Sequence, residues 1–278
     1  MIANKIITFL GAGSMAEAII AGLVSHNIVK PSQIIATNLA DKQKLEELQQ
    51  RYGIQTTSNR KEAVEKADIV ILAMKPKSVN DAISEVRERT SVNQLFISVL
   101  AGITTAYIED LLGHQAPVIR TMPNTSAKVG ASATAICRGE HASDIHVEEA
   151  ATLFAAVGTV SIVHEDKIDA VTGIAGSGPA YFYFLVEAME KAAAEAGLTK
   201  EEASAFITQT IVGVGKRLQT TTKTSRELYE EVMSPNGTTE AGINVLREHH
   251  TQEAVQEAIT KAIARAKELG AILTETKS

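Results

Sequence analysis

The sequence predicts an α/β protein, with a doubly wound parallel sheet at residues 1–163 and an all-helical domain at residues 164–278. Three observations support this prediction. Short apolar runs alternate with amphipathic helical patterns through the first part. The run at residues 69–73 is apolar without interruption, as a strand covered on both faces needs to be. After His164 only helical patterns remain.

Composition and charge narrow the class of protein. The 278 residues are 45% hydrophobic and 22% charged, which is ordinary for a folded globular chain. A net charge of −6 without a basic block gives no footprint for nucleic acid. No apolar run reaches the roughly 18 residues of a membrane span. The chain begins directly with a strand and shows no signal peptide, so we expect a cytoplasmic protein without nucleic-acid or membrane partners.

Cysteine and histidine usage predicts no metal centre. Cys137 is the single cysteine, which excludes an intrachain disulfide. It lies in an apolar run without a basic cluster, so we expect a buried and unreactive thiol. The seven histidines show no metal-binding spacing.

Residues 6–23 predict a strand, a glycine turn and a helix. The turn carries G-x-G-x-x-A, in which Gly11 permits a tight turn and Gly13 lets the backbone approach a pyrophosphate. Ala16 would pack the helix closely on the sheet. The N-terminus of the helix offers free N–H groups to phosphates. This spacing predicts a Rossmann-type, dinucleotide-binding domain.

The second strand, at residues 33–38, ends where such domains contact the adenosine ribose. An acidic residue there would favour NAD, but the chain carries Asn38. Lys42 and Lys44 follow closely, whereas Asp41 opposes them. We therefore predict that NADPH is preferred and that NADH is possible.

The remaining strands bring further loops to the same edge. We expect strands at residues 55–58, 68–74, 95–99, 118–121, 133–137 and 159–163. Lys75-Pro76 ends the central strand, and Ser78 is expected to cap the next helix. Ligands bind beyond the carboxyl ends of parallel strands, so Ala73 and Lys75 should face the cofactor.

The helical half shows apolar stripes at residues 180–196, 199–214 and 251–269, which predict a core or a subunit interface. Two loops interrupt it, at residues 173–179 and 234–239. Pro235 ends one helix, and Thr238 or Thr239 is expected to cap the next. Free N–H groups at that helix start would suit a substrate carboxylate, although a plain capped turn explains the pattern equally well.

Five segments together resemble the pyrroline-5-carboxylate reductase family over nearly the whole chain. They are GAGSMAEAII, DIVILAMKP, RTMPNTSAKVG, AVTGIAGSGPAY and MSPNGTTEAG. The resemblance implies reduction of the cyclic imine L-1-pyrroline-5-carboxylate to L-proline, the last step of proline biosynthesis, with hydride from NADPH or NADH. It also implies a homodimer or higher homo-oligomer formed through the helical domain.

The resemblance further implies roles for particular residues. Thr239 would be the catalytic residue that hydrogen-bonds the ring nitrogen. The substrate carboxylate would be held around Ser234, Asn236, Gly237 and Thr238. The implied cofactor contacts are Gly11, Ala12, Gly13, Ser14, Met15, Asn38, Asn59, Ala73, Lys75, Pro76 and Ala101.

The chain departs from the family pattern in three places. Asn236 replaces a usual glycine, Ser14 replaces a common Asn or Gln, and residues 219–223 lack the acidic or His-Pro residues of many members. The alternative functions are a hydroxyacid dehydrogenase of similar plan, a non-catalytic cofactor-binding protein and a reductase of a different cyclic imine acid. The dehydrogenase would need a catalytic lysine where Phe182 stands.

Overall fold

The computed structural model describes residues 2–275, with side chains through residue 271. The chain forms two compact units. One contains the chain through Pro179 together with the segment from Lys261 onward, and the other contains Ala180–Thr260. The predicted domain boundary between residues 163 and 164 stays a prediction, because these compact units are defined by backbone contacts and not by domain function.

The first unit is built on an eight-stranded sheet in the order β3-β2-β1-β4-β5-β6-β7-β8. Strands β1 to β6 run parallel, which confirms the predicted doubly wound plan. Each lies within two residues of its predicted position, because each is a short apolar run between turns. The bounds are β1 Ile7–Leu10, β2 Ile34–Thr37, β3 Gln55–Thr57, β4 Ile69–Leu72, β5 Leu95–Ser98, β6 Val118–Met122, β7 Ser132–Arg138 and β8 Gly158–Ile162.

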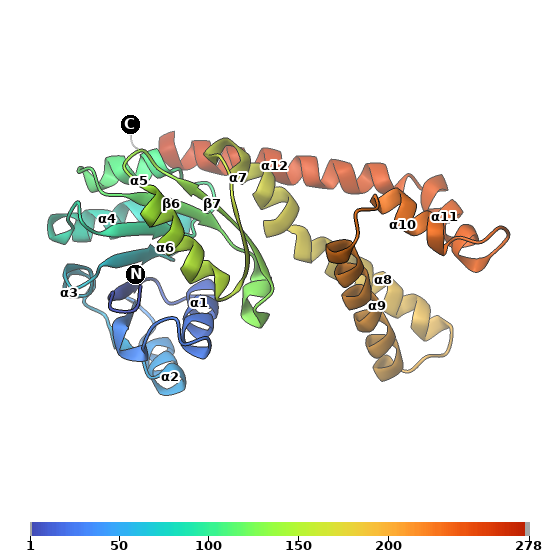
Figure 1. The fold of residues 1–278 in the computed structure, drawn as a ribbon, viewed down its shortest axis with the longest axis horizontal. Coiled ribbons are helices and arrows are strands. Elements are labelled where there is room, and N and C mark those ends of the chain that lie inside the picture. The colour runs from blue at the N-terminus through green and yellow to red at the C-terminus, as the bar shows by residue number, and fades with distance from the viewer. Residues whose placement is uncertain (1, 276–278) are drawn as a thin grey trace. The chain divides into compact units, whose positions relative to one another are not determined.

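Helices cover both faces of this sheet (Figure 1). Alternate strand residues point to opposite sides, so Phe9 packs with the helices of one face and Leu10 with those of the other. The first face carries α1 Ser14–Ser25, α2 Lys42–Tyr52 and α6 Asp144–Ala155. The second carries α3 Arg60–Glu65, α4 Val79–Val86 and α5 Thr105–Leu112.

The last two strands depart from the uniformly parallel sheet that the sequence predicts. Strand β7 pairs with β6 in antiparallel register, and β8 then pairs with β7 in parallel register. The connection between β6 and β7, residues 123–131, holds only a 3₁₀ turn at Thr125–Val129. A parallel crossover needs a dozen or more residues, so this short connection can only reverse the chain. Helix α6 provides the crossover from β7 to β8.

The second unit is all-helical, as predicted, and has little core of its own. Its helices are α8 Gly178–Glu195, α9 Lys200–Thr220, α10 Ser225–Val232, α11 Thr238–Glu248 and α12 Thr251–Glu275 (Figure 1). Helix α8 begins in the first unit, and α12 continues into it from Lys261. Within Ala180–Thr260 the only buried apolar side chains are Ala203 and Ile207. Phe182 and Phe184 are 62% and 74% exposed. Among the described residues, no helix combines the length and apolarity needed to cross a membrane.

Candidate functional site

The glycine turn between β1 and α1 has the geometry that phosphate binding needs. Gly11 has φ +110°, and a Cβ there would lie 2.6 Å from the carbonyl oxygen of Ala73, so only glycine fits. Gly13 is the N-cap of α1, and a Cβ there would meet no atom within 4 Å. No side chain caps α1, and Ala16 is fully buried. The first N–H groups of α1 therefore face open space that a pyrophosphate can enter.

Of the two lysines near Asn38, Lys42 is available to a phosphate and Lys44 is paired within the protein. The Oδ1 atom of Asn38 accepts hydrogen bonds from the N–H groups of Ala40 and Asp41, both at 3.2 Å. This orientation leaves the amide NH₂ to serve as a donor toward a ribose or a 2′-phosphate. Lys44, however, forms an ion pair with Glu17 at 2.7 Å. Lys42 is exposed and is the lysine that remains available.

The other predicted cofactor residues lie at the same edge of the sheet. Ala73 follows β4, and its N–H donates to the carbonyl of Leu10. Lys75 and Pro76 begin the 3₁₀ turn Pro76–Ser78. Ala101 is exposed in the loop after β5. The parallel order of the strands thus brings these sequence-distant residues to one edge.

Two side chains near this edge have structural roles of their own. Asn59 caps α3, because its Oδ1 accepts from the N–H of Glu62 at 3.2 Å. The prediction that Ser78 caps α4 is wrong: Ser78 stands at the N-cap position, but its side chain makes no capping hydrogen bond. The 3₁₀ turn at residues 76–78 leads directly into α4 and replaces a side-chain cap.

The segment at residues 173–179, predicted as a loop, is largely helical. Thr172–Gly176 forms a π-helical turn between α7 Ile168–Val171 and α8. Its glycines tolerate the wider turn, in which the N–H of Ser177 donates to the carbonyl of Thr172 at 2.8 Å. The sequence pattern of small residues indicated a helix breaker but could not distinguish a loop from a π-turn.

A buried arginine holds the residues that lead into this segment, and sequence reasoning missed it. Arg120 on β6 is 2% exposed, and its guanidinium lies 3.3 Å from Glu165 and 3.4 Å from Asp169. Glu165 also accepts hydrogen bonds from the N–H and hydroxyl of Thr105 at the start of α5. The signal was an arginine within an otherwise apolar strand, since a buried charge requires partners.

The second unit contains the predicted substrate loop, and its helix start differs from the prediction. Neither Thr238 nor Thr239 is the N-cap of α11; Gly237 holds that position, without a capping side chain. The helix begins at Thr238, so the hydroxyls of both threonines are not engaged as caps. The N–H of Gly237 closes a turn onto the carbonyl of Ser234 at 2.9 Å. An uncapped helix N-terminus is suited to an anionic group.

Asn236 occupies the tight position in this turn. Its φ is +58°, a left-handed conformation that glycine and asparagine adopt more readily than other residues. The conformation explains how asparagine can stand where the family usually has glycine. The N–H of Asn236 donates to the carboxylate of Glu240 at 2.8 Å. A carboxylate from the chain itself therefore occupies one donor of this turn.

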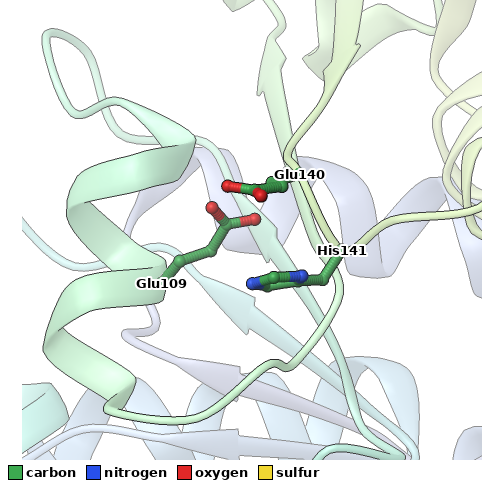
Figure 2. A group of neighbouring side chains, drawn as sticks. All are labelled: Glu109, Glu140 and His141. Carbon is green, nitrogen blue, oxygen red and sulfur yellow. The ribbon is translucent and has the colours of Figure 1, made fainter.

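A group of possible metal ligands lies elsewhere. Figure 2 shows Glu109 on α5 beside Glu140 and His141 in the connection between β7 and α6, with one ligand atom of each within 4.8 Å of the others. The group adjoins the amino end of β6, since the N–H of Gly139 donates to Val118, and so lies away from the cofactor edge. Glu140 is exposed, and exposed acidic groups commonly gather without an ion. The expectation of no metal stays a prediction.

Cys137 lies within β7 and is 1% exposed, which confirms the predicted burial. Burial, with a smaller contribution from Glu165, raises the pKa of its thiol to about 12. The thiol is therefore protonated at neutral pH and takes no part in the candidate site.

Comparison with known proteins agrees with this geometry in both parts of the chain. Residues 6–102 match the model of the family described as NADP oxidoreductase, coenzyme F420-dependent, and residues 165–269 match that of pyrroline-5-carboxylate reductase dimerisation. The fold and the glycine turn, together with these matches, define a dinucleotide-dependent oxidoreductase with a dimerisation domain.

Individual relatives are similar over the whole chain. Pyrroline-5-carboxylate reductase 1 of Bacillus subtilis is 43% identical over 273 residues, which cover 98% of this chain and 92% of that relative. The pyrroline-5-carboxylate reductase of Methanosarcina acetivorans is 36% identical, with 96% of this chain and 98% of the relative covered. This chain belongs to the pyrroline-5-carboxylate reductase family.

Solved structures support the same assignment. A pyrroline-5-carboxylate reductase from Coxiella burnetii superposes with a TM-score of 0.86 at 36% identity, covering 95% of this chain and 98% of that one. A pyrroline carboxylate reductase from Plasmodium falciparum with NADP bound has a TM-score of 0.88, with 96% and 98% covered, and at 24% identity it shows the shared fold alone.

Proposed function

We propose that this protein reduces L-1-pyrroline-5-carboxylate to L-proline with hydride from NADPH, the last step of proline biosynthesis. The observation that carries the proposal is the uncapped start of α11, where Thr238 and Thr239 follow a tight turn within one of the segments that resemble the family. The membership of the chain in the reductase family supports it. NADPH is the preferred cofactor and NADH a possible one.

The residues at the carboxyl edge of the first sheet would hold the cofactor. The pyrophosphate fits at the turn from Gly11 to Met15, because Gly13 leaves space and α1 is uncapped. Asn38 would donate to the ribose or its 2′-phosphate. Asn59, Ala73, Lys75, Pro76 and Ala101 would line the remainder of the site. When bound, the cofactor supplies the hydride.

The substrate would be recognised by the turn before α11. The backbone around Asn236, Gly237 and Thr238 is suited to the carboxylate, as anions bind at helix N-termini without an arginine. The N–H groups of Asn236 and Gly237 already donate to Glu240 and to Ser234, so the donors would be those of the first turn of α11, from Thr238 onward. Ser234 faces the same turn, since a Cβ added at Gly237 would collide with it. The positive dipole end of α11 would add to this attraction.

Thr239 would act on the ring nitrogen. An imine carbon is electrophilic, and more so when the nitrogen is protonated, so the chain's main task is placement. The hydroxyl of Thr239 would donate a hydrogen bond to the nitrogen as the C=N bond becomes a single bond. The carbon gains the hydride and the nitrogen keeps its proton.

The helical unit would form the contact between subunits. The exposed apolar side chains on α8 and α9 are too numerous for a monomer's surface and lie in the region that matches the dimerisation model: Phe182, Tyr183, Phe184, Leu185, Met189, Phe206, Ile211, Val212, Val214 and Leu218. We propose a homodimer or a larger homo-oligomer, in the cytoplasm, with small-molecule ligands and without a nucleic-acid partner. The domain boundary is proposed at residues 163/164.

The test is an assay of cofactor oxidation by the purified protein. NADPH absorbance is followed with and without L-1-pyrroline-5-carboxylate, L-proline is quantified, and the assay is repeated with NADH. Imine-dependent oxidation with an equal amount of proline is expected, faster with NADPH. A folded protein that binds NADPH but oxidises neither cofactor would overturn the proposal and leave a different cyclic imine or a non-catalytic role.

A further inference from the structure

The π-helical turn at Thr172–Gly176 is an unusual element close to the cofactor edge. It interrupts the helical run that starts with α7 and continues as α8, and π-turns of this kind occur frequently at functional sites. It lies just before α8, the helix that carries the chain into the second unit after Pro179. The contacts that hold this turn in place therefore bear on the reaction.

A hydrogen bond to the carbonyl of Ala175 holds the turn in place. In an α-helix this carbonyl would accept from the N–H four residues later, but that residue is Pro179, which has none. The side chain of Asn124 supplies a donor instead, with its Nδ2 atom 3.1 Å from the Ala175 oxygen. An asparagine from a distant part of the sequence thus satisfies a carbonyl that the helix itself cannot satisfy in the usual way.

Asn124 is oriented by its other partners. It is 8% exposed, and its Oδ1 accepts from the N–H of Ser126 at 3.1 Å. Its own backbone N–H donates to the hydroxyl of Ser132 at 3.0 Å. The amide oxygen and the amide nitrogen therefore have distinct partners, and only a side chain with both a donor and an acceptor fits.

Asn124 also lies at the edge of the sheet where the cofactor would bind. It follows the carboxyl end of β6, the strand next to β5, whose following loop holds Ala101. Arg120, on the same strand, holds Glu165 and Asp169. The segment leading to the turn is thereby attached to β6 at its start by Arg120 and at the turn by Asn124.

We propose that Asn124 is a positioning residue for imine reduction: its amide fixes the π-helical turn against the end of β6 and so holds the backbone at the edge of the sheet where the cofactor would bind. The inference rests on the proposed reductase function and adds a residue to it. Space is left next to the turn at Gly178, the first residue of α8, where a Cβ would meet no atom within 4 Å. Misplacement of reacting groups by about 1 Å can cost about 100-fold in rate.

The test compares two variants of the full-length protein. Asn124→Asp has the same shape and still accepts from Ser126, but a carboxylate cannot donate to the Ala175 carbonyl. Ser126→Ala is the matched control, because it changes a neighbouring side chain of the same loop and keeps both the backbone N–H that donates to Asn124 and the Asn124–Ala175 contact. If Asn124→Asp does not fold, Asn124→Ala removes the donor without adding a charge.

Two independent readouts are needed. Hydrogen exchange at the Ser177 amide, which the π-turn protects, should become faster in the Asn124 variant and stay unchanged in Ser126→Ala. The kcat should fall about 10- to 100-fold in the Asn124 variant, with the Kd for NADPH within about twofold of the wild type.

Unchanged exchange at Ser177, an unchanged kcat, or an equal loss of kcat in Ser126→Ala would overturn the inference. The exchange measurement does not depend on turnover. An inactive wild type would therefore count against the reductase function, and unchanged exchange against the role of Asn124.

Discussion

The ammonium group of Lys44 lies 2.7 Å from a carboxylate oxygen of Glu17, and this ion pair joins α2 to the first turn of α1. Arg51 and Tyr52 contact the other oxygen at 3.1 and 3.2 Å. The hydrogen bond from Lys44 is the main reason that the pKa of Glu17 is lowered below its usual 4.5. The helix that would bind the pyrophosphate is thus fixed to the helix beside the ribose site.

Glu17→Gln should lower stability at neutral pH and have less effect in acid. The folded protein lowers the pKa of Glu17 below its usual 4.5, so the ionised carboxylate stabilises the fold above pH 4.5 and loses that effect as the pH falls through the lowered value. We expect a loss of about 0.5–1 kcal/mol at pH 7, and a smaller difference below pH 4.5. Urea unfolding at both pH values measures it. The exposed Glu46→Gln on α2 is the control, and a difference that grows in acid would contradict the prediction.

Gly11 and Gly13 should respond differently to the same substitution. Gly11→Ala places a Cβ 2.6 Å from the Ala73 oxygen at a positive φ, so we expect a loss of about 2 kcal/mol or more. Gly13→Ala meets no protein atom and should cost less than about 1 kcal/mol, yet its methyl enters the proposed pyrophosphate space. Its Kd for NADPH should rise at least about 10-fold. Thermal unfolding and fluorescence titration separate the two, and tight NADPH binding by Gly13→Ala would place the pyrophosphate elsewhere.

Thr239→Val should reduce turnover without loss of the cofactor. Valine has the shape of threonine but no hydroxyl, so it would leave the lone pair that forms on the nitrogen without a donor, which costs about 1–3 kcal/mol. We therefore expect kcat to fall about 10- to 100-fold with an unchanged Kd for NADPH. Thr239→Ser should restore most of the rate. Full turnover by the valine variant, or a rate lost together with NADPH binding, would exclude the proposed role.

Glu240→Gln should strengthen binding of the anionic substrate. Glutamine can still accept from the N–H of Asn236 and keep the turn, but the negative charge beside the proposed carboxylate site is gone. The KM for L-1-pyrroline-5-carboxylate should fall about 2- to 5-fold. The KM for 1-pyrroline, which lacks the carboxylate, should stay the same. Equal shifts for both imines would mean that Glu240 acts on the turn and not on the charge.

Phe184→Glu should break the subunit contact. The side chain is 74% exposed in the single chain, so a charge there costs little within the protomer but much in an apolar interface. Sedimentation should show the wild type as a dimer or larger and the variant shifted toward the monomer. Exposed Glu190→Gln on α8 is the control. An unchanged assembly would place the interface on another surface.

The parallel part of the fold is predictable because its signals are local. The uninterrupted run of β4 and the glycines before α1 specify a buried strand and a phosphate turn without reference to the rest of the chain. The direction of β7, in contrast, is not specified by the residues of the strand itself. It depends on how residues 123–131 close the connection, and strand residues 132–138 alternate in the same way whichever direction they run.

The candidate site is predictable at the level of position but not of hydrogen bonding. The motif around Thr239 marks the turn, yet which residue caps α11 depends on backbone geometry, and Gly237 holds that place. Lys44 is close to Asn38 in sequence, but its partner Glu17 comes from another helix. Arg120 and Asn124 likewise contact segments about 50 residues away. An arginine within an apolar strand signals that it has partners, but no pattern of nearby residues reveals which ones.

The burial of Cys137 gives the protein a practical advantage for spectroscopy. With a pKa near 12 and no other cysteine in the chain, the native thiol is inert to maleimides at neutral pH. A cysteine introduced on the surface of the folded protein would therefore be the single reactive position on each subunit. Fluorophores or spin labels could be attached pairwise without first removing a native residue.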